Sequence, residues 1–219
     1  MERTMRILEN LPLFHGIDSG DLKSLLQCLA PRLSHHEKGE IIYLAGENTH
    51  SFGIVLSGQV QVYQEDYYGN KSIFANLNVG DMFGESFACA EIKRLPVSVV
   101  TTAESELLFI DCRRLAAPCQ SACSFHGSLI RNMLNIIAMK NIELTQKIEI
   151  TSRRTTREKL LAFLSAQAQR AGGSQFVIPF DRQELADYLG VDRSAMSAEL
   201  GRLRDSGVLR FNKNQFELL

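Results

Sequence analysis

The side chains in this sequence that are best suited to chemistry lie near its C-terminus. Arg193, Ser194, Ser197 and Arg202 fall along one predicted helix and have no apolar role to fill in it. Guanidinium and hydroxyl groups are the groups that bond to phosphate oxygens and to the edges of bases. Their types and spacing therefore predict a surface that contacts DNA.

The neighbouring residues predict the elements that position this surface. Leu185, Ala186 and Leu189 have the spacing of the inner face of one short helix. Gly190 is able to take the left-handed conformation that ends a helix, and Asp192 is a suitable N-cap for the next one. The second helix then has its own apolar stripe, made of Ala195, Met196, Leu200 and Leu203.

Gly207 closes the second helix and is followed by a short strand at Val208–Phe211. Two helices around a tight glycine turn, followed by a strand, are the pattern of a winged helix-turn-helix. Residues 151–219 contain 11 Lys and Arg against 8 Asp and Glu, a net charge of +3, whereas residues 1–150 carry −4. This asymmetry favours a polyanion as partner, although a helical subdomain that touches no DNA has the same spacing.

The N-terminal half of the chain has a different pattern. Residues 18–30 have the spacing of one amphipathic helix. From Leu33 to about Ile110, short alternating runs such as Phe52–Leu56 and Gln59–Tyr63 are separated by glycine turn signals. Many short strands of this kind predict an antiparallel β-roll, and the whole chain is expected to be α+β.

The longest helical pattern runs from about Ser124 to Ile150. It contains an apolar seam with alternating steps of four and three, formed by Ile130, Leu134, Ile137, Asn141, Leu144 and Ile148. A neighbouring stripe of Leu129, Met133 and Ile136 could lie on the roll. The seam predicts a homodimeric coiled coil in which Asn141 fixes the register, and the alternative is a helix buried wholly against its own chain.

Composition argues against several other classes. The chain has no uninterrupted apolar run near 18 residues, and its polar N-terminus is unlike a signal peptide. Five cysteines are most simply read as free thiols in a cytoplasmic protein without a membrane association. Residues 52–110 contain no histidine, and no histidine in the chain has metal-ligand spacing. We therefore expect no catalytic residues, no metal site and no enzyme activity.

The order of these elements resembles the cyclic-AMP receptor protein/FNR family of transcription regulators over essentially the whole chain. The most specific stretches are Gly58-Gln-Val-Gln-Val62, Val79-Gly-Asp-Met-Phe-Gly-Glu85, Arg154-Thr-Thr-Arg-Glu-Lys-Leu160 and Arg182-Gln-Glu-Leu-Ala186. The resemblance implies a cyclic-nucleotide-binding-like jelly roll that senses a small effector, at residues 1–123. It implies a dimerisation helix at 124–150 and a winged helix-turn-helix at 151–219. Members bind near-palindromic operators as dimers, and RNA polymerase is a further partner if the protein is an activator.

The resemblance also places the effector pocket. Gly84, Glu85 and Ser86 match the loop that receives the phosphate and ribose of cyclic AMP. The pocket would also include Asn141 on the long helix. Where cyclic-AMP-binding members have an Arg-Ser pair, this chain has Leu95-Pro96, with Arg94 one position earlier. A buried phosphate without its arginine is an unpaired charge, so we expect an effector other than cyclic AMP, of unknown identity.

One alternative function is a cyclic-nucleotide-binding regulatory module that acts on a partner other than DNA. Redox and haem sensing are alternatives for the input of a regulator. Iron–sulfur members carry a cysteine cluster near the N-terminus, and residues 1–27 of this chain contain no cysteine. No haem ligand stands out. Cys28, Cys89, Cys112, Cys119 and Cys123 are expected to be small core residues, with Cys119 and Cys123 close enough in sequence for a thiol switch.

The DNA contacts follow from position in the helix-turn-helix. At the N-terminal end of the recognition helix we expect Arg193, Ser194, Ala195 and Ser197. Arg193 could make a bidentate contact to guanine. A common arginine of the family, one turn further along, is Ala198 here. Phosphate contacts are expected from Arg182, Gln183, Arg202 and Arg210.

Overall fold

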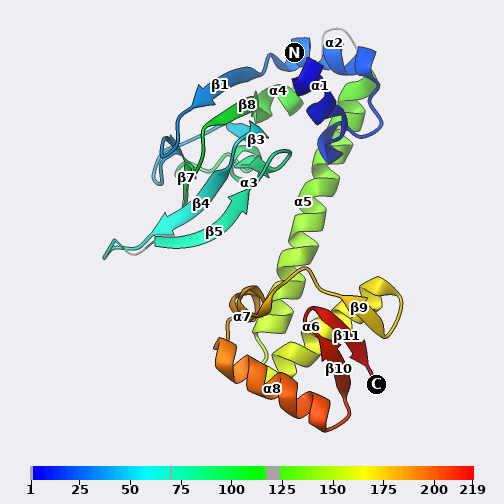
Figure 1. Cartoon of the computed structure of the whole chain (residues 1–219). Helices are drawn as coiled ribbons and strands as arrows, with labels where there is room; N and C mark the ends of the chain where they lie inside the picture. The colour runs from blue at the N-terminus through cyan, green and yellow to red at the C-terminus, as the bar shows by residue number, and fades with distance from the viewer. Residues whose placement is uncertain (1, 70, 117–123) are drawn as a thin grey trace. The chain divides into compact units, whose positions relative to one another are not determined.

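The computed structural model describes residues 2–69, 71–116 and 124–219 (Figure 1). The chain forms two compact units, Met1–Ala138 and Met139–Leu219. The boundary falls within one long helix, α5 (Ser124–Thr151). Within the described residues, no helix combines the length and apolarity needed to cross a bilayer.

The first unit begins with three short helical elements, α1 (Glu2–Glu9), η1 (Pro12–Phe14) and α2 (Ser19–Leu29). The carboxylate of Asp18 caps α2 by accepting hydrogen bonds from the amides of Gly20 and Asp21 at 2.9 and 2.8 Å. The predicted helix at 18–30 is therefore confirmed, and a local cap explains where it begins.

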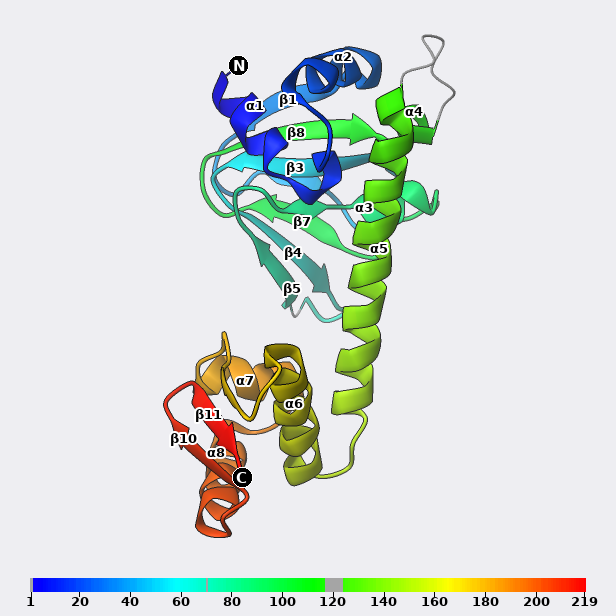
Figure 2. The same ribbon diagram turned by 90° about the vertical axis from the view of Figure 1, so that its right-hand side faces the viewer.

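Two four-stranded antiparallel sheets make up the β-roll (Figure 2). The first has the order β1-β8-β3-β6, with bounds Arg32–His36, Ser105–Asp111, Ser51–Ser57 and Met82–Phe83. The second has the order β2-β7-β4-β5, with bounds Ile41–Tyr43, Ser98–Thr101, Val60–Glu65 and Lys71–Leu77. Two short helices complete the roll, α3 (Glu85–Cys89) and α4 (Cys112–Ala116). The prediction of an antiparallel roll is confirmed.

The central strands of the first sheet, β3 and β8, are buried on both faces. On β3, Ile54 packs among the N-terminal helices and α5, whereas Val55 packs in the interior of the roll. On β8, Ile110 packs on the side of the N-terminal helices and α5, and Phe109 packs in the interior of the roll. Successive side chains of a strand point to opposite faces, so a strand between two cores is apolar throughout. This explains why Phe52–Leu56 is a continuous apolar run.

Helix α5 covers the roll with the stripe that the sequence assigned to it. Leu129 and Met133 are buried in the core that also holds the N-terminal helices, and Ile136 packs partly against it. Asn132 adds two hydrogen bonds from its amide nitrogen, to the carbonyls of Leu13 and His15 at 3.0 and 2.8 Å. Packing against the roll therefore fixes which face of this part of α5 stays outside.

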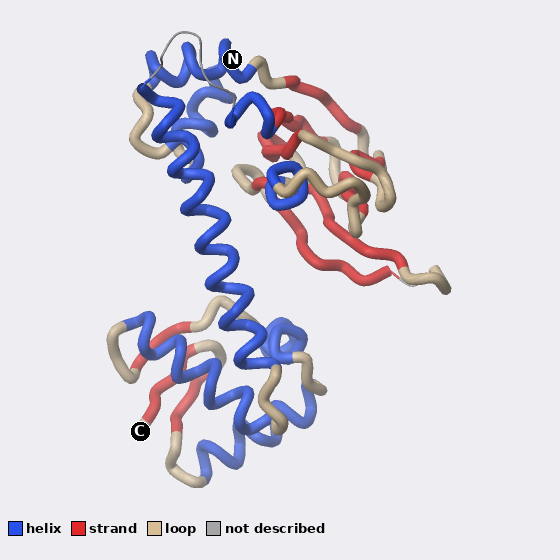
Figure 3. The backbone as a smooth tube through the Cα atoms, turned by 180° about the vertical axis from the view of Figure 1, so that it is seen from behind, coloured by secondary structure: helices blue, strands red, loops and turns tan. Residues whose placement is uncertain are grey.

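The second unit has a three-stranded antiparallel sheet beside three further helices (Figure 3). Its elements in order are α6 (Thr156–Ala171), β9 (Gln175–Val177), α7 (Arg182–Leu189), α8 (Arg193–Asp205), β10 (Leu209–Asn212) and β11 (Gln215–Leu218). One apolar core joins these elements and includes Phe163, Leu185, Met196 and Leu203. Two helices followed by a β-hairpin confirm the winged helix-turn-helix pattern.

The cysteines differ from the prediction of free thiols. Cys89 ends α3 and Cys112 begins α4, and the two are joined by a disulfide with their Cα atoms 5.7 Å apart. Cys28 is free and exposed, while Cys119 and Cys123 lie outside the described residues. The prediction was wrong for this pair because 23 residues separate its members, and only the return of the chain through β7 and β8 brings them together.

Candidate DNA interface and effector loop

The turn between α7 and α8 is built from local caps. Asp181 and Glu184 form a reciprocal capping box at the start of α7, and Gly190 ends that helix with φ 61°. Asp192 then caps α8 by accepting from the Ala195 amide at 2.9 Å. The Ser194 hydroxyl is the main cause, ahead of the Ala195 amide, of a lowered pKa at Asp192. This cap stays charged at neutral pH and sets the residue at which α8 begins.

Lys159 of α6 supports the same turn from the other side. Its ammonium donates to the carbonyl of Leu189 at 3.2 Å, and the carbonyl of Gly190 lies 3.5 Å away. A cation at the C-terminal end of a helix satisfies carbonyls that have no partner within the helix. The turn is therefore connected to α6.

The N-terminal half of α8 presents the side chains that the sequence predicted for DNA. Arg193, Ser194, Ala195 and Ser197 are all exposed, while Met196 points into the core with no exposed surface. Among the described residues, the Arg193 guanidinium has no ion-pair or hydrogen-bond partner. It is free to contact a base edge.

Arg202 is exposed but engaged within the protein. Its guanidinium lies 3.0 Å from one carboxylate oxygen of Glu199, and Arg157 of α6 lies 3.1 Å from the other. Burial would raise the pKa of Glu199, but the hydrogen bonds from Arg202 and Arg157 outweigh it and hold the pKa low. Arg202 therefore helps to set the position of α8, in addition to any phosphate contact.

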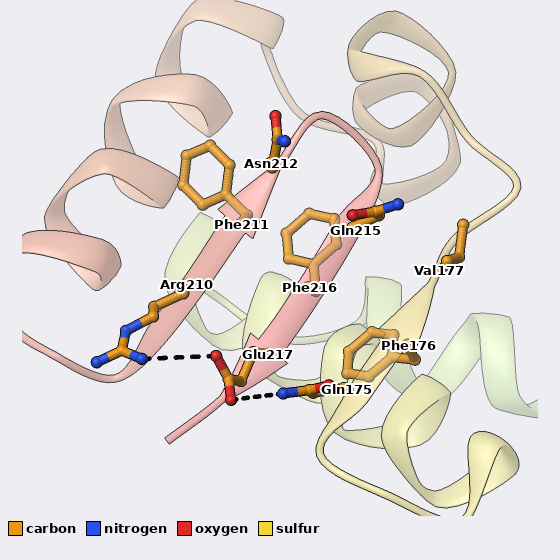
Figure 4. A pocket seen from close by; sticks show the side chains of 9 residues that line it. All are labelled: Gln175, Phe176, Val177, Arg210, Phe211, Asn212, Gln215, Phe216 and Glu217. Atoms are coloured by element: carbon orange, nitrogen blue, oxygen red, sulfur yellow. Dashed lines mark hydrogen bonds and ion pairs between the residues drawn. The ribbon is translucent and has the colours of Figure 1, made fainter.

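Arg182 and Arg210 also have internal contacts. The Arg182 guanidinium lies over the ring of Phe211 at 4.8 Å and over that of Phe216 at 5.4 Å, and burial lowers its pKa. Arg210 lies 3.8 Å from Glu217, which also accepts from Gln175 on β9 (Figure 4). Arg182 therefore connects the start of α7 to the wing sheet.

Two further residues belong to this surface: Gln183, which the sequence predicted, and Lys213, which was missed in the sequence. Gln183 at the start of α7 is exposed, but its amide donates to Asp187 at 2.9 Å, which orients it along the helix. Lys213 lies in the β10–β11 turn with φ 53° and is exposed. The sequence Asn212-Lys213-Asn214 between two strands indicates the turn that holds Lys213, because asparagine is common in tight hairpin turns.

The candidate effector loop of the roll begins at Gly84, which precedes α3 and has φ 78°. The positive φ of Gly84 favours glycine, and a Cβ at this position would also lie 3.1 Å from the Tyr43 ring. The Tyr43 ring in turn packs edge-on against Phe83 and Phe109, with centroids 5.7 and 6.0 Å away. Gly84 therefore has a structural role in the roll whatever the ligand.

The other candidate pocket residues differ in their exposure. Glu85 is buried and Ser86 is exposed. Leu95 is 3% exposed, and its backbone pairs with the segment before β3, accepting from Gly46 at 2.8 Å and donating to Glu47 at 2.7 Å. The inward position at this site is therefore apolar.

Arg94 and Pro96, on either side of Leu95, are both exposed. Asn141 belongs to the second unit, where the Thr145 hydroxyl lies 3.3 Å from its side-chain oxygen. Its assignment to the pocket stays a prediction. Within the described residues, no group of three or more His, Cys, Asp or Glu is placed to hold a metal ion.

The predicted dimer seam is largely uncovered on α5. Leu134, Leu144 and Ile148 expose 62%, 61% and 67% of their surface, and Ile130 exposes 37%. Ile137 packs partly against the core of the first unit. An apolar stripe of this kind is unusual on the surface of a monomer.

Comparisons with known proteins agree with this architecture. Residues 33–121 match the family model for a cyclic nucleotide-binding domain, and residues 158–219 match that for a Crp-like helix-turn-helix domain. The cyclic AMP receptor protein of Thermus thermophilus is 24% identical over 211 residues, covering 96% of this chain and 94% of that protein. The nitrogen fixation regulation protein FixK of Bradyrhizobium diazoefficiens is 24% identical over 210 residues, covering 93% and 84%.

The same fold is found in the crystal structure of the Thermus thermophilus catabolite activator protein. The TM-score is 0.51 at 22% identity, covering 95% of this chain and 93% of that one. Together, a cyclic nucleotide-binding domain followed by a Crp-like helix-turn-helix makes this chain a member of the Crp/Fnr family of DNA-binding transcription regulators.

Proposed function

We propose that this regulator is a homodimer that recognises a near-palindromic operator, with Arg193 making the main base contact from each copy. The observation that carries the proposal is the exposed N-terminal half of α8, where Arg193 alone among the predicted arginine contacts has no internal partner in the described part of the chain. Ser194 and Ser197 are exposed on the same half of the helix. Arg182, Arg202, Arg210 and Lys213 would contact phosphates, which position the protein without reading sequence.

The exposed seam of α5 supports the homodimer. The helix has 28 residues and so extends about 42 Å, which is enough for several turns of paired apolar side chains. A second copy of the chain would bury Leu134, Leu144 and Ile148 and place two α8 helices on one DNA duplex. Such a dimer would act in the cytoplasm, where the chromosome is, and RNA polymerase would be a further partner if it activates transcription.

We further propose that the effector is not cyclic AMP, although one relative is named for that ligand. Leu95 is buried at the position where the resemblance calls for a phosphate-binding arginine. An apolar side chain cannot neutralise a phosphate, and leaving a buried charge unpaired costs several kcal/mol. Gly84 does not argue for the nucleotide, because its positive φ and the nearby Tyr43 ring already favour glycine at this position.

Selection from random duplexes followed by fluorescence anisotropy tests the DNA proposal. We expect an enriched site with two-fold symmetry and half-sites about one helical turn apart, bound far more tightly than random DNA at the same salt concentration. Enrichment of an asymmetric site, or none at all, would contradict it. Calorimetric titration with cyclic AMP tests the effector, and tight binding would show that Arg94 or another cation replaces the missing arginine.

A further inference from the structure

The disulfide between Cys89 and Cys112 joins two elements that have different roles in the roll. Cys89 is the last residue of α3, the helix that begins with the candidate effector residues Glu85 and Ser86. Cys112 is the first residue of α4, which follows β8 directly. The bond therefore connects the end of the effector loop to the end of the first sheet.

The two ends of this connection are held differently. The Cys112 amide donates to the carbonyl of His50 at 2.8 Å, and the Arg113 side chain pairs with Asp111 at 2.7 Å, so the α4 end is fixed to the sheet. Beyond Cys89 the chain turns at Glu91 with φ 50°, a conformation that is uncommon for a residue with a side chain. Ala88 packs α3 into the core of the first unit, and the disulfide adds a covalent link from the last residue of α3 to α4.

A hollow of about 210 Å³ lies beside the bond. Cys89 and Cys112 line it together with side chains of α5, including Ile130, Leu134 and Ile137 from the predicted dimer seam. All of these residues belong to the first unit. A shift of α3 relative to α4 changes the space against which this part of α5 packs, so the redox state of the pair is placed to reach the seam.

The chemistry of the pair is reversible and needs only a two-electron oxidant. The thiolate of Cys89, the more exposed of the two, attacks one oxygen of hydrogen peroxide and becomes a sulfenic acid. The O–O bond breaks, and the departing hydroxide takes up the proton that the thiol released and leaves as water. The thiol of Cys112 then attacks that sulfur, the disulfide forms, and a second water leaves. Two thiols and one peroxide thus give one disulfide and two waters. A small-molecule or protein dithiol reverses the change by exchange.

We propose that Cys89 and Cys112 form an oxidative modification site through which a peroxide, or a low-molecular-weight disulfide, controls the DNA affinity of the regulator. The output rests on the proposed DNA-binding function, whereas the thiol chemistry does not. In the cytoplasm, where that function places the protein, thiols are normally kept reduced and disulfides that do form are mostly transient and regulatory. A reversible pair is therefore a better fit to this position than a permanent structural bond.

The test begins with a chain in which Cys28, Cys119 and Cys123 are replaced by serine, so that only the pair remains. Thiol titration is expected to find two free thiols per chain after dithiothreitol and none after hydrogen peroxide. Peptide mapping of the oxidised wild-type chain is expected to link Cys89 to Cys112. A link from either residue to another cysteine, or thiols that resist oxidation, would overturn the proposal.

DNA affinity is then measured by anisotropy across a series of glutathione redox buffers. We expect it to change about fivefold or more, with the same midpoint as the thiol titration. Cys89→Ser and Cys112→Ala in the same background should remove this response, and their thermal unfolding checks that they fold. The disulfide would be purely structural if the DNA affinity does not change with the redox state. The same would follow if the Cys89–Cys112 bond stays intact in buffers as reducing as the cytosol.

A chain that binds no DNA in either redox state would contradict the proposed function instead. The redox proposal is then decided by sedimentation velocity in the same buffers. A monomer–dimer equilibrium that follows the thiol titration would support an effect of the pair on α5, and an unchanged equilibrium would overturn it.

Discussion

Arg157 of α6 and Glu199 of the recognition helix form an ion pair at 3.1 Å. Glu199 is largely buried, although it lies on the helix predicted to meet DNA, and its other oxygen accepts from Arg202 at 3.0 Å. The pair joins α6 to α8. The orientation of α8 is therefore set by a charged contact as well as by apolar packing.

Replacing Glu199 by glutamine should destabilise the second unit by about 1 kcal/mol, a modest value because Arg157 and Arg202 are partly exposed. The pKa of Glu199 is lowered in the folded state from an ordinary 4.5, so its contribution is present above that value and is lost as the pH falls through the folded pKa. Urea unfolding of the wild type and of Glu199→Gln should differ at pH 7 and converge in acid. A difference that persists in acid would mean that shape, not charge, is responsible.

Arg193→Ala should relax sequence preference. Loss of a bidentate contact to guanine should cost about 1–3 kcal/mol of discrimination between operator and random DNA. The substitution should have little effect on folding because the Arg193 side chain is exposed. Anisotropy on both DNAs measures the ratio. Arg204→Ala is the matched control, since Arg204 lies at the other end of α8 beside Asp205. Equal losses on both DNAs would refute a base contact by Arg193.

Arg182→Ala should weaken binding to all DNA alike and also loosen the wing. Removing a phosphate contact lowers the slope of log affinity against log salt by about 1. Removing the cation from the rings of Phe211 and Phe216 should cost about 1 kcal/mol of stability, measured by urea unfolding.

Arg182→Lys separates the two roles, because lysine keeps the charge but not the planar stacking group. It should retain the salt slope and lose part of the stability. An unchanged salt slope in Arg182→Ala would show that the side chain serves only the fold.

If the proposed homodimer pairs through α5, Leu134→Glu combined with Ile148→Glu should give a folded monomer. Both side chains are more than half exposed in the single chain, so the fold does not need them, whereas like charges facing each other across a seam are repulsive. The sedimentation coefficient, measured by sedimentation velocity, and the affinity for DNA should both decrease. Asn135→Ala, at a neighbouring exposed position, should leave both unchanged, and a double variant that stays dimeric would place the interface elsewhere.

The sequence by itself determined the parts of this protein that depend on neighbouring residues. Gly190 and Asp192 predicted the turn and the cap before α8, and Leu129 and Met133 predicted which stripe of α5 lies on the roll. These features follow from backbone freedom, capping and helical periodicity, which act over a few residues. The DNA and dimer contacts that rest on the same patterns stay predictions.

Only the tertiary structure decided which side chains are already engaged. Arg182 was expected to be free for phosphate but lies on two rings of the wing, and Cys89 and Cys112 were expected to be thiols but form a bond. Arg157 and Glu199 are 42 residues apart, and no local sequence pattern around either residue predicts that they pair. Such pairs depend on how whole helices and sheets pack, because packing brings distant side chains within bonding distance without leaving a local pattern.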